Sequence, residues 1–249
     1  MCAVSLMAAR NDPNRPMSMV MMGGPIDTRV NPSSVNTYAT KHTLQWFEEH
    51  VISRVPAKYL GFGRRVYPGF LQHYGFVAMN PNHHAKSHQE FFYDLLKGDE
   101  ADAQTHRKFY DEYNAVLDLD AAYYLETVQR VFQEFQLPRG VMEVSGQRID
   151  PSKISDVALM TIEGELDDIS CPGQTHAAHG LCPNIPEARR KHLLVEGCGH
   201  YGIFSGSRWR NIAYPAIREF IAAEEQFTLQ ASSRAAKPNA IKTSAKRKK

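Results

Sequence analysis

Residues 190–202 read RKHLLVEGCGHYG, and this stretch decides the fold. Leu193 to Val195 form an apolar run between a basic turn and two glycines, which is typical of a buried strand in a parallel sheet. His200 then stands in the loop at the carboxyl end of that strand, before a helical pattern begins. Because reactive side chains gather in such loops, His200 is a candidate general base.

The same residues spell G-x-G-x-x-G from Gly197 to Gly202, the pattern of a dinucleotide-binding turn. Such a turn needs a complete strand–helix–strand unit and an acidic residue about 20 residues further on, at the end of the next strand. No further strand pattern follows Gly202, and Glu219 falls inside a helical pattern. The sequence therefore predicts no nucleotide and no other cofactor.

Two further apolar runs also predict buried strands. Residues 17–22 close with a Gly-Gly-Pro turn, and residues 156–163 lead to Gly164 and then to the acidic pair Asp167 and Asp168. Thirty-three residues separate Asp167 from His200, which is room for one strand–helix–strand crossover. We therefore expect the acidic loop and the His200 loop on the same edge of the sheet.

From residue 31 to residue 150 the apolar residues recur at helical spacing, and strand-like runs disappear. One helical face is expected from Phe109 to Phe135, and a shorter helix over residues 88–97. Residues 41–140 hold 18 of the 25 Phe, Tyr and Trp side chains of the chain. These rings fit either a helical core that uses aromatic volume, or an apolar surface for a hydrophobic substrate or partner.

The sequence predicts an α/β protein in three parts: an α/β core over residues 1–30 and 151–230, a helical cap over 31–150, and a disordered basic tail over 231–249. Helices are expected at both ends of the core, over residues 2–10 and 207–225, and Pro215 is expected to kink the second.

Charge is distributed unevenly along the chain. The first 230 residues carry 22 Lys or Arg and 27 Asp or Glu, whereas residues 231–249 carry seven Lys or Arg and no acid. The tail is expected to be a solubilising extension, or to attach to an acidic partner or to nucleic acid. The four cysteines form no C-x-x-C pair, and the sequence contains no signal peptide and no run long enough to span a membrane. We therefore expect a cytoplasmic protein with reduced thiols.

Two histidine clusters raise the question of a metal. The first comprises His83, His84 and His88; no carboxylate completes it, and a solvated helix N-terminus explains it better. His176, His179 and Cys182 recur at three-residue steps and lack a fourth ligand. The sequence therefore predicts no metal site.

A carboxylate after one parallel strand and a histidine after the next are the last two members of an α/β-hydrolase triad. We assign the acid to Asp167 and the base to His200, with Asp168 in reserve. No G-x-S-x-G elbow precedes them. The simplest explanation is that the chain begins just after the elbow, so that the N-terminal half of the sheet is missing.

Several longer motifs carry a family resemblance: MVMMGGPIDTR at 19–29, YPGFLQ at 67–72, FYDEY at 109–113, YYLETV at 123–128, EGELDDI at 163–169 and GHYG at 199–202. In these motifs the chain resembles the intracellular polyhydroxyalkanoate (poly-3-hydroxybutyrate) depolymerases. The resemblance implies an α/β-hydrolase fold with a helical cap and a polyester granule surface as partner. It also implies Asp167 as acid, His200 as base, and a cysteine nucleophile that lies before the position of Met1.

Three functions follow from these expectations. The first is a polyester hydrolase whose nucleophile is absent from this chain, which is therefore expected to be inactive as given. The second is a related acyltransferase of polymer synthesis, which the GHYG motif and the aromatic cap disfavour. The third is a non-catalytic remnant that binds granules or partners through the cap and the tail.

Overall fold

The computed structural model describes residues 1–79 and 81–235. The chain is of mixed α/β class and forms two compact units. One unit comprises Met1–Ser33 and the chain from Gln136 onward, and the other comprises Ser34–Phe135. The second unit spans fewer residues than the cap expected over residues 31–150, because residues 31–33 and 136–150 belong to the first unit.

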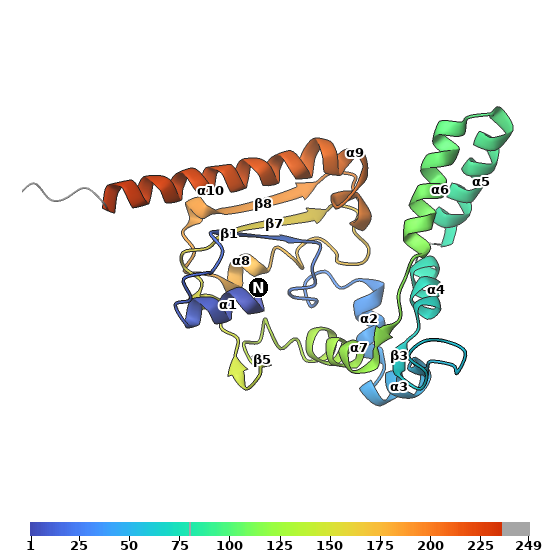
Figure 1. The fold of residues 1–249 in the computed structure, drawn as a ribbon, viewed down its shortest axis with the longest axis horizontal. Helices are drawn as coiled ribbons and strands as arrows, with labels where there is room; N and C mark the ends of the chain where they lie inside the picture. Colours follow the sequence, from blue (N-terminus) through green and yellow to red (C-terminus); the bar gives the residue numbers. More distant parts are fainter. Residues whose placement is uncertain (80, 236–249) are drawn as a thin grey trace, which may run out of the picture. The chain divides into compact units, whose positions relative to one another are not determined.

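A three-stranded parallel sheet forms the centre of the first unit, in the order β1-β7-β8 (Figure 1). The strands are β1 (Ser18–Met22), β7 (Ala158–Gly164) and β8 (Arg190–Val195). All seven residues of β7 are buried, as expected for a central strand covered on both faces. The three predicted strands and their parallel direction are thereby confirmed, but the burial expected of β8 is not: of its residues only Val195 is buried, and Leu194 is 41% exposed.

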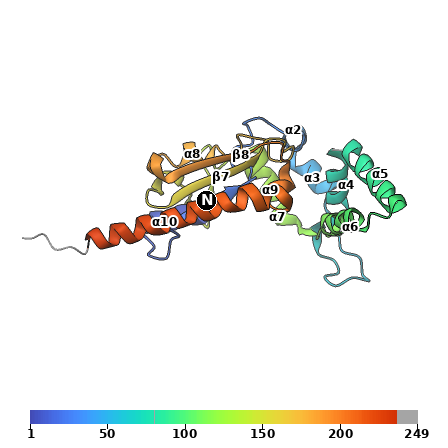
Figure 2. The ribbon, with the colours of Figure 1, turned by 90° about the horizontal axis from the view of Figure 1, so that it is seen from above.

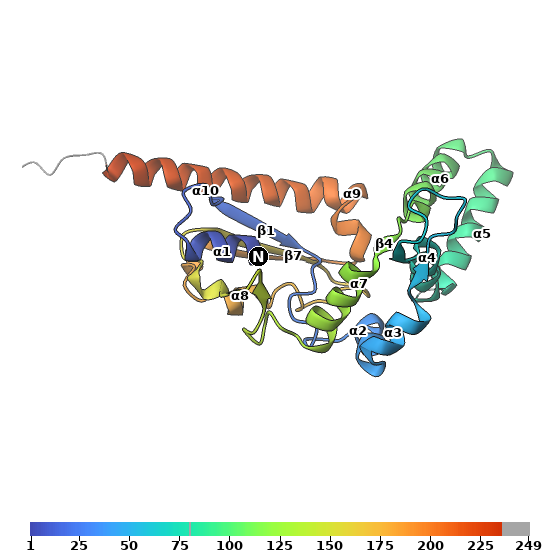
Figure 3. The ribbon, with the colours of Figure 1, turned by 60° about the horizontal axis from the view of Figure 1, so that its bottom comes forward.

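Helices cover both faces of this sheet (Figures 1 and 3). Helix α10 (Tyr214–Ala235) lies along one face, where Phe220 belongs to the same buried cluster as Met160 and Ile162 of β7. Helices α1 (Cys2–Ala9) and α8 (Ala178–Leu181) lie on the opposite face and pack with Leu159. Because successive side chains of a strand point to opposite faces, β7 contributes to both cores.

The remaining elements of the first unit are short: the hairpin strands β5 (Glu143–Val144) and β6 (Gln147–Arg148), 3₁₀ turns at Pro151–Lys153, Glu187–Arg189 and His200–Ile203, helix α9 (Gly206–Arg208), and a π-helical turn at Trp209–Ala213. That π-helical turn ends two residues before Pro215, where a kink was expected, and its wider turn accommodates the carbonyl with which the proline ring would clash.

Helix α10 continues through residues 231–235, which the sequence assigned to the tail. The rest of the expected basic tail, residues 236–249, lies outside the described residues. The acidic partner and the nucleic acid expected for this tail stay predictions.

The second unit is mainly helical, with helices α2 (Ser34–Lys41), α3 (Leu44–His50), α4 (Gly69–Met79), α5 (Pro81–Lys97), α6 (Glu100–Asn114) and α7 (Ala121–Thr127), and a π-helical segment at Val128–Gln133. Three short antiparallel strands join it: β2 (Ser53–Arg54), β3 (Arg65–Tyr67) and β4 (Leu119–Asp120). The expectation that this region contains no strands was therefore wrong.

The single helical face expected from Phe109 to Phe135 was also wrong. Helix α6 ends at Asn114, and a new helix begins only at Ala121. The side chain of Asp120 accepts hydrogen bonds from the N–H groups of Ala122 and Tyr123, so that a strong N-cap starts the second helix.

Aromatic rings occur both in the core and at the surface. Phe47, Tyr110 and Tyr113 are buried and supply core volume. Other rings stand at the surface, among them Phe62 and Phe70, with 69% and 70% of their area exposed. Among the described helices, none is both long enough and apolar enough to cross a lipid bilayer.

Candidate functional site

The loops that follow β7 and β8 lie against each other at one edge of the sheet. The N–H of Leu166 donates to the carbonyl of Cys198 at 2.9 Å, and the N–H of Gly197 donates to the Glu165 carboxylate at 2.7 Å. Gly164 allows this approach, because a Cβ atom there would lie 2.5 Å from the carbonyl oxygen of Cys198. The two loops therefore hold each other in a fixed position.

This arrangement brings Asp167 and His200 together, as the sequence predicted. His200 Nδ1 lies 2.7 Å from Oδ2 of Asp167, and the carboxylate side chain is fully buried whereas the imidazole is 20% exposed. The other carboxylate oxygen, Oδ1, accepts hydrogen bonds from the N–H groups of Ile169 and Ser170 at 2.9 and 2.8 Å. Asp167 is thus held on one side by the backbone and on the other by the imidazole.

The contact with Asp167 decides which nitrogen of His200 carries the proton. An ionised carboxylate only accepts hydrogen bonds, so Nδ1 must donate and the neutral ring keeps its lone pair on Nε2. No hydrogen bond joins Nε2 to another side chain in the part of the chain that the structure describes. Asp168, the reserve acid, lies exposed next to Asp167 and forms no hydrogen bond with His200.

Strand β1 also reaches this site, through the residue that follows it. Gly23 has a φ of +50°, and a Cβ atom there would lie 3.1 Å from Cε1 of His200 and 3.1 Å from Cδ1 of Ile203. The carboxyl ends of all three strands therefore meet at the imidazole.

Replacing Gly23 with alanine should disturb His200 directly. The left-handed conformation costs a residue with a Cβ about 1–2 kcal/mol, and the methyl group would press on the imidazole. We expect a corresponding loss in the free energy of unfolding, measured in urea, together with a shift of the His200 ring signals in NMR spectra. Gly24→Ala is the control, since its Cβ would meet no atom closer than 4.0 Å. Equal effects of the two substitutions would contradict the prediction.

None of the four cysteine thiols forms a hydrogen bond with His200. Cys2 lies 3.7 Å from the sulfur of Met142, and the Cys198 thiol is directed to the carbonyl of Gly199. Burial raises the pKa of Cys171, with a further contribution from the charges of Asp167 and Asp168, and burial also raises the pKa of Cys198. A thiol with a raised pKa is a poor nucleophile at neutral pH.

Glu163 supports the site, a role that no motif in the sequence indicates. Its carboxylate is buried and accepts three backbone hydrogen bonds, from Gly173, Thr175 and His176, at 2.7 to 2.9 Å. The hydroxyl of Thr175 in turn donates to the carbonyl of Gly24 at 2.8 Å. Glu163 thereby fixes the loop after β7 to the turn that follows β1. The sequence feature that could have indicated this role is an acidic residue inside a largely apolar strand.

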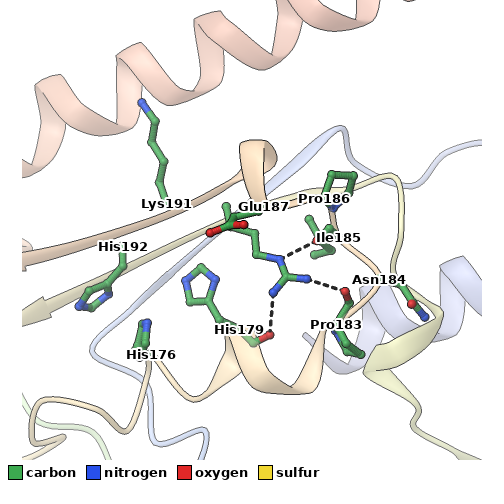
Figure 4. Close-up of a pocket in the computed structure, with 10 residues that line it drawn as sticks. His176, His179, Pro183, Asn184, Ile185, Pro186, Glu187, Lys191 and His192 are labelled. Carbon is green, nitrogen blue, oxygen red and sulfur yellow. Dashed lines mark hydrogen bonds between the residues drawn. The ribbon is translucent and has the colours of Figure 1, made fainter.

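A second polar cluster lies beside this support, since His192 Nε2 is 3.8 Å from Oε2 of Glu163. Its three histidines, His176, His179 and His192, are labelled in Figure 4. The hydroxyl of Thr161 is 2.9 Å from His179 Nε2 and 2.8 Å from His192 Nδ1, and His176 packs against both imidazoles. One hydroxyl proton cannot serve two rings, so Thr161 donates to one and accepts from the other. Burial lowers the pKa of His179 to about 4 and also lowers that of His192, which favours neutral rings.

The three imidazoles line an open cavity of about 700 Å³. Cys182, which the sequence grouped with His176 and His179, is instead buried in the core, where burial raises its pKa to about 11. Within residues 1–79 and 81–235, no group of three or more His, Cys, Asp or Glu side chains could hold a metal ion.

The other histidine cluster begins helix α5, as expected, but it is not simply solvated. His84 is buried, and its two ring nitrogens lie 2.9 Å from the hydroxyl of Tyr110 and 3.2 Å from that of Tyr113. The expectation of a solvated helix start was therefore wrong for His84. The tyrosines that satisfy it come from α6, and sequence proximity gave no sign of them.

Comparison with known proteins is consistent with the motifs in the sequence. The family model described as "PHB de-polymerase C-terminus" matches residues 23–225, a range that includes Gly23, Asp167 and His200. No curated protein matches the chain. Since the matched range covers most of the chain, the protein belongs to the PHB depolymerase C-terminal family.

Proposed function

We propose that Asp167 and His200 are the acid and the base of an ester-hydrolysing triad that acts on poly-3-hydroxybutyrate. The observation that carries the proposal is the 2.7 Å contact between His200 Nδ1 and Asp167 Oδ2, at the carboxyl ends of neighbouring parallel strands. The acid precedes the histidine in the chain, which is the order found in α/β hydrolases. Membership of a depolymerase family supports the polymer as substrate.

In this mechanism Nε2 of His200 takes the proton from a nucleophile as it attacks the ester carbonyl. The imidazolium then gives that proton to the departing hydroxyl group of the polymer, which leaves an acyl-enzyme. A water molecule, deprotonated by the same nitrogen, releases the acid and restores the nucleophile. Asp167 keeps Nδ1 protonated throughout and stabilises the imidazolium with its buried negative charge.

The nucleophile in this proposal lies outside the described residues. The family resemblance gives a cysteine for this role, and none of the four cysteine thiols of the chain forms a hydrogen bond with His200. Polymer binding without catalysis is the second candidate function. It is favoured by the same observation, that no cysteine thiol of the chain forms a hydrogen bond with His200.

The chain of residues 1–249 on its own should therefore release no 3-hydroxybutyrate from amorphous polymer at an enzymatic rate, because no thiolate reaches the base. The same chain joined to the nucleophile-bearing segment of a family depolymerase should release it. Product can be measured enzymatically after incubation with amorphous particles. Normal turnover by the chain alone would contradict the placement of the nucleophile. Folded fusions that bind polymer and never turn over would favour the binding function.

The state of His200 can be tested without turnover. ¹⁵N NMR of the ring should show the tautomer protonated at Nδ1, and Asp167→Asn should shift the proton to Nε2, because an amide NH₂ donates to Nδ1. An unchanged tautomer in that variant would contradict the proposed role of Asp167.

A further inference from the structure

The loop between β2 and β3 exposes three apolar side chains at its tip. Leu60 is fully exposed, and Tyr59 and Phe62 expose 57% and 69% of their area. Figure 2 shows the loop projecting beyond the helices of its unit. Single exposed apolar residues are common, but three within four positions of one projecting loop form a patch that suggests a contact surface.

The loop has a defined backbone structure. Its two sides are joined by hydrogen bonds from Val55 N to Arg64 O and from Gly63 N to Val55 O, both 3.0 Å. Gly61 and Gly63 take left-handed φ values of 84° and 80°, which turn the chain on both sides of Phe62. An ordered loop loses little conformational entropy on binding, so the exposed side chains are presented ready for contact.

Basic side chains surround this tip. Residues 51–68 contain Arg54, Lys58, Arg64 and Arg65 and no acidic residue, and Arg65 is paired with Glu48 of α3 at 2.6 Å. Arg54 donates to the carbonyl of Gly63 at 2.9 Å, and the Lys58 ammonium lies 4.9 Å from the centre of the Tyr59 ring. The tip thus combines apolar side chains at its end with positive charge at its base. This charge also disfavours pairing with a second copy of the same loop.

We propose that this loop, residues 55–64, attaches the protein to the surface of its polyester particle. Leu60 and Phe62 enter the apolar polymer, and Lys58 and Arg64 pair with carboxylates at the surface. Hydrolysis of a polyester leaves one carboxylate end for each ester bond cut, so a partly degraded particle carries the complementary charge. The proposal rests on the proposed function for the identity of the polymer, and it needs no turnover.

The test is co-sedimentation of the full chain with amorphous poly-3-hydroxybutyrate particles. The double variant Leu60→Ser with Phe62→Ser should weaken binding about 30-fold or more, because two apolar contacts are lost. Leu229→Ser is the matched control: Leu229 is 65% exposed on α10 of the other unit, and binding should change less than about 2-fold. Far-UV circular dichroism should show both variants folded, since the replaced side chains are largely exposed.

A second variant pair separates charge from apolar contact. Lys58→Gln with Arg64→Gln should weaken binding about 10-fold at low ionic strength, and the difference should vanish at high salt. Neutral phosphatidylcholine vesicles and vesicles with phosphatidylserine serve as the alternative surface. Binding to vesicles but not to polymer would overturn the proposal in favour of a lipid surface.

Unchanged polymer binding by the Leu60/Phe62 double variant would also overturn it. Failure of the proposed function looks different: loop-dependent binding would persist, while the His200 tautomer would not respond to Asp167→Asn. The two proposals can therefore fail separately.

Discussion

Replacing His200 with alanine should lower polyester hydrolysis about 10⁴-fold or more, in a form of the protein to which a nucleophile has been supplied. Without the imidazole, no group takes the proton from the nucleophile or returns it to the leaving hydroxyl. The fold should persist, because Asp167 keeps its two backbone donors, Ile169 and Ser170. The rate of 3-hydroxybutyrate release and the urea midpoint of the same variant are the two measurements.

The neighbouring aspartates provide the control for this prediction. Asp167→Asn should lower the rate nearly as much, about 10⁴-fold, by presenting the wrong tautomer of His200. Asp168→Asn should change it less than about 3-fold, because Asp168 is exposed and makes no hydrogen bond with the imidazole. A severe loss at Asp168, with Asp167 silent, would assign the acid to the other neighbour.

The sheet and the meeting of Asp167 with His200 were predictable from the sequence for a physical reason. A strand covered on both faces is largely apolar, and β7 is buried over its whole length, so that apart from Thr161 and Glu163 it reads as one apolar run. Parallel strands bring their carboxyl ends to a common edge. Chain order and strand length alone therefore place the two residues near each other.

Features that depend on distant partners were not predictable. Glu163 is satisfied by backbone donors 10 to 13 residues further along, in a loop with no local pattern. His84 is satisfied by tyrosines 26 and 29 residues away. Thr161 brings His192 to His179 across two strands and a helix. In each case a polar residue is paired by a tertiary contact with a partner that no local sequence pattern indicates.

The exposed tip of the loop at residues 55–64 was not predictable for the opposite reason. Its sequence, VPAKYLGFGR, is short and apolar enough to pass as part of a helical region. Only the structure shows that Leu60 contacts solvent and not a core. The nearby glycines were the usable signal, since two glycines around one aromatic residue disfavour a helix.

The second large effect is expected at Glu163. Glu163→Gln should lower the free energy of unfolding by about 2–4 kcal/mol, because a hydrogen bond to a charged group contributes about 1.5–3 kcal/mol and three of them lose their charged acceptor. The amide NH₂ of glutamine would also face backbone N–H groups of residues 173–176. Urea unfolding followed by circular dichroism measures the loss.

Glu165→Gln is the matched control, since the same substitution is made two residues further on, at an exposed carboxylate with one backbone donor, Gly197. It should cost less than about 1 kcal/mol. The substitution at Glu163 should also change the surroundings of His200. Glu163 accepts a hydrogen bond from the N–H of Thr175, and the Thr175 hydroxyl donates to the carbonyl of Gly24. Gly24 follows Gly23, which lies against the imidazole. A His200 ring signal that stays unchanged while stability falls would show that Glu163 holds only its own loop. Equal losses at Glu163 and Glu165 would show that burial of the carboxylate is not what matters.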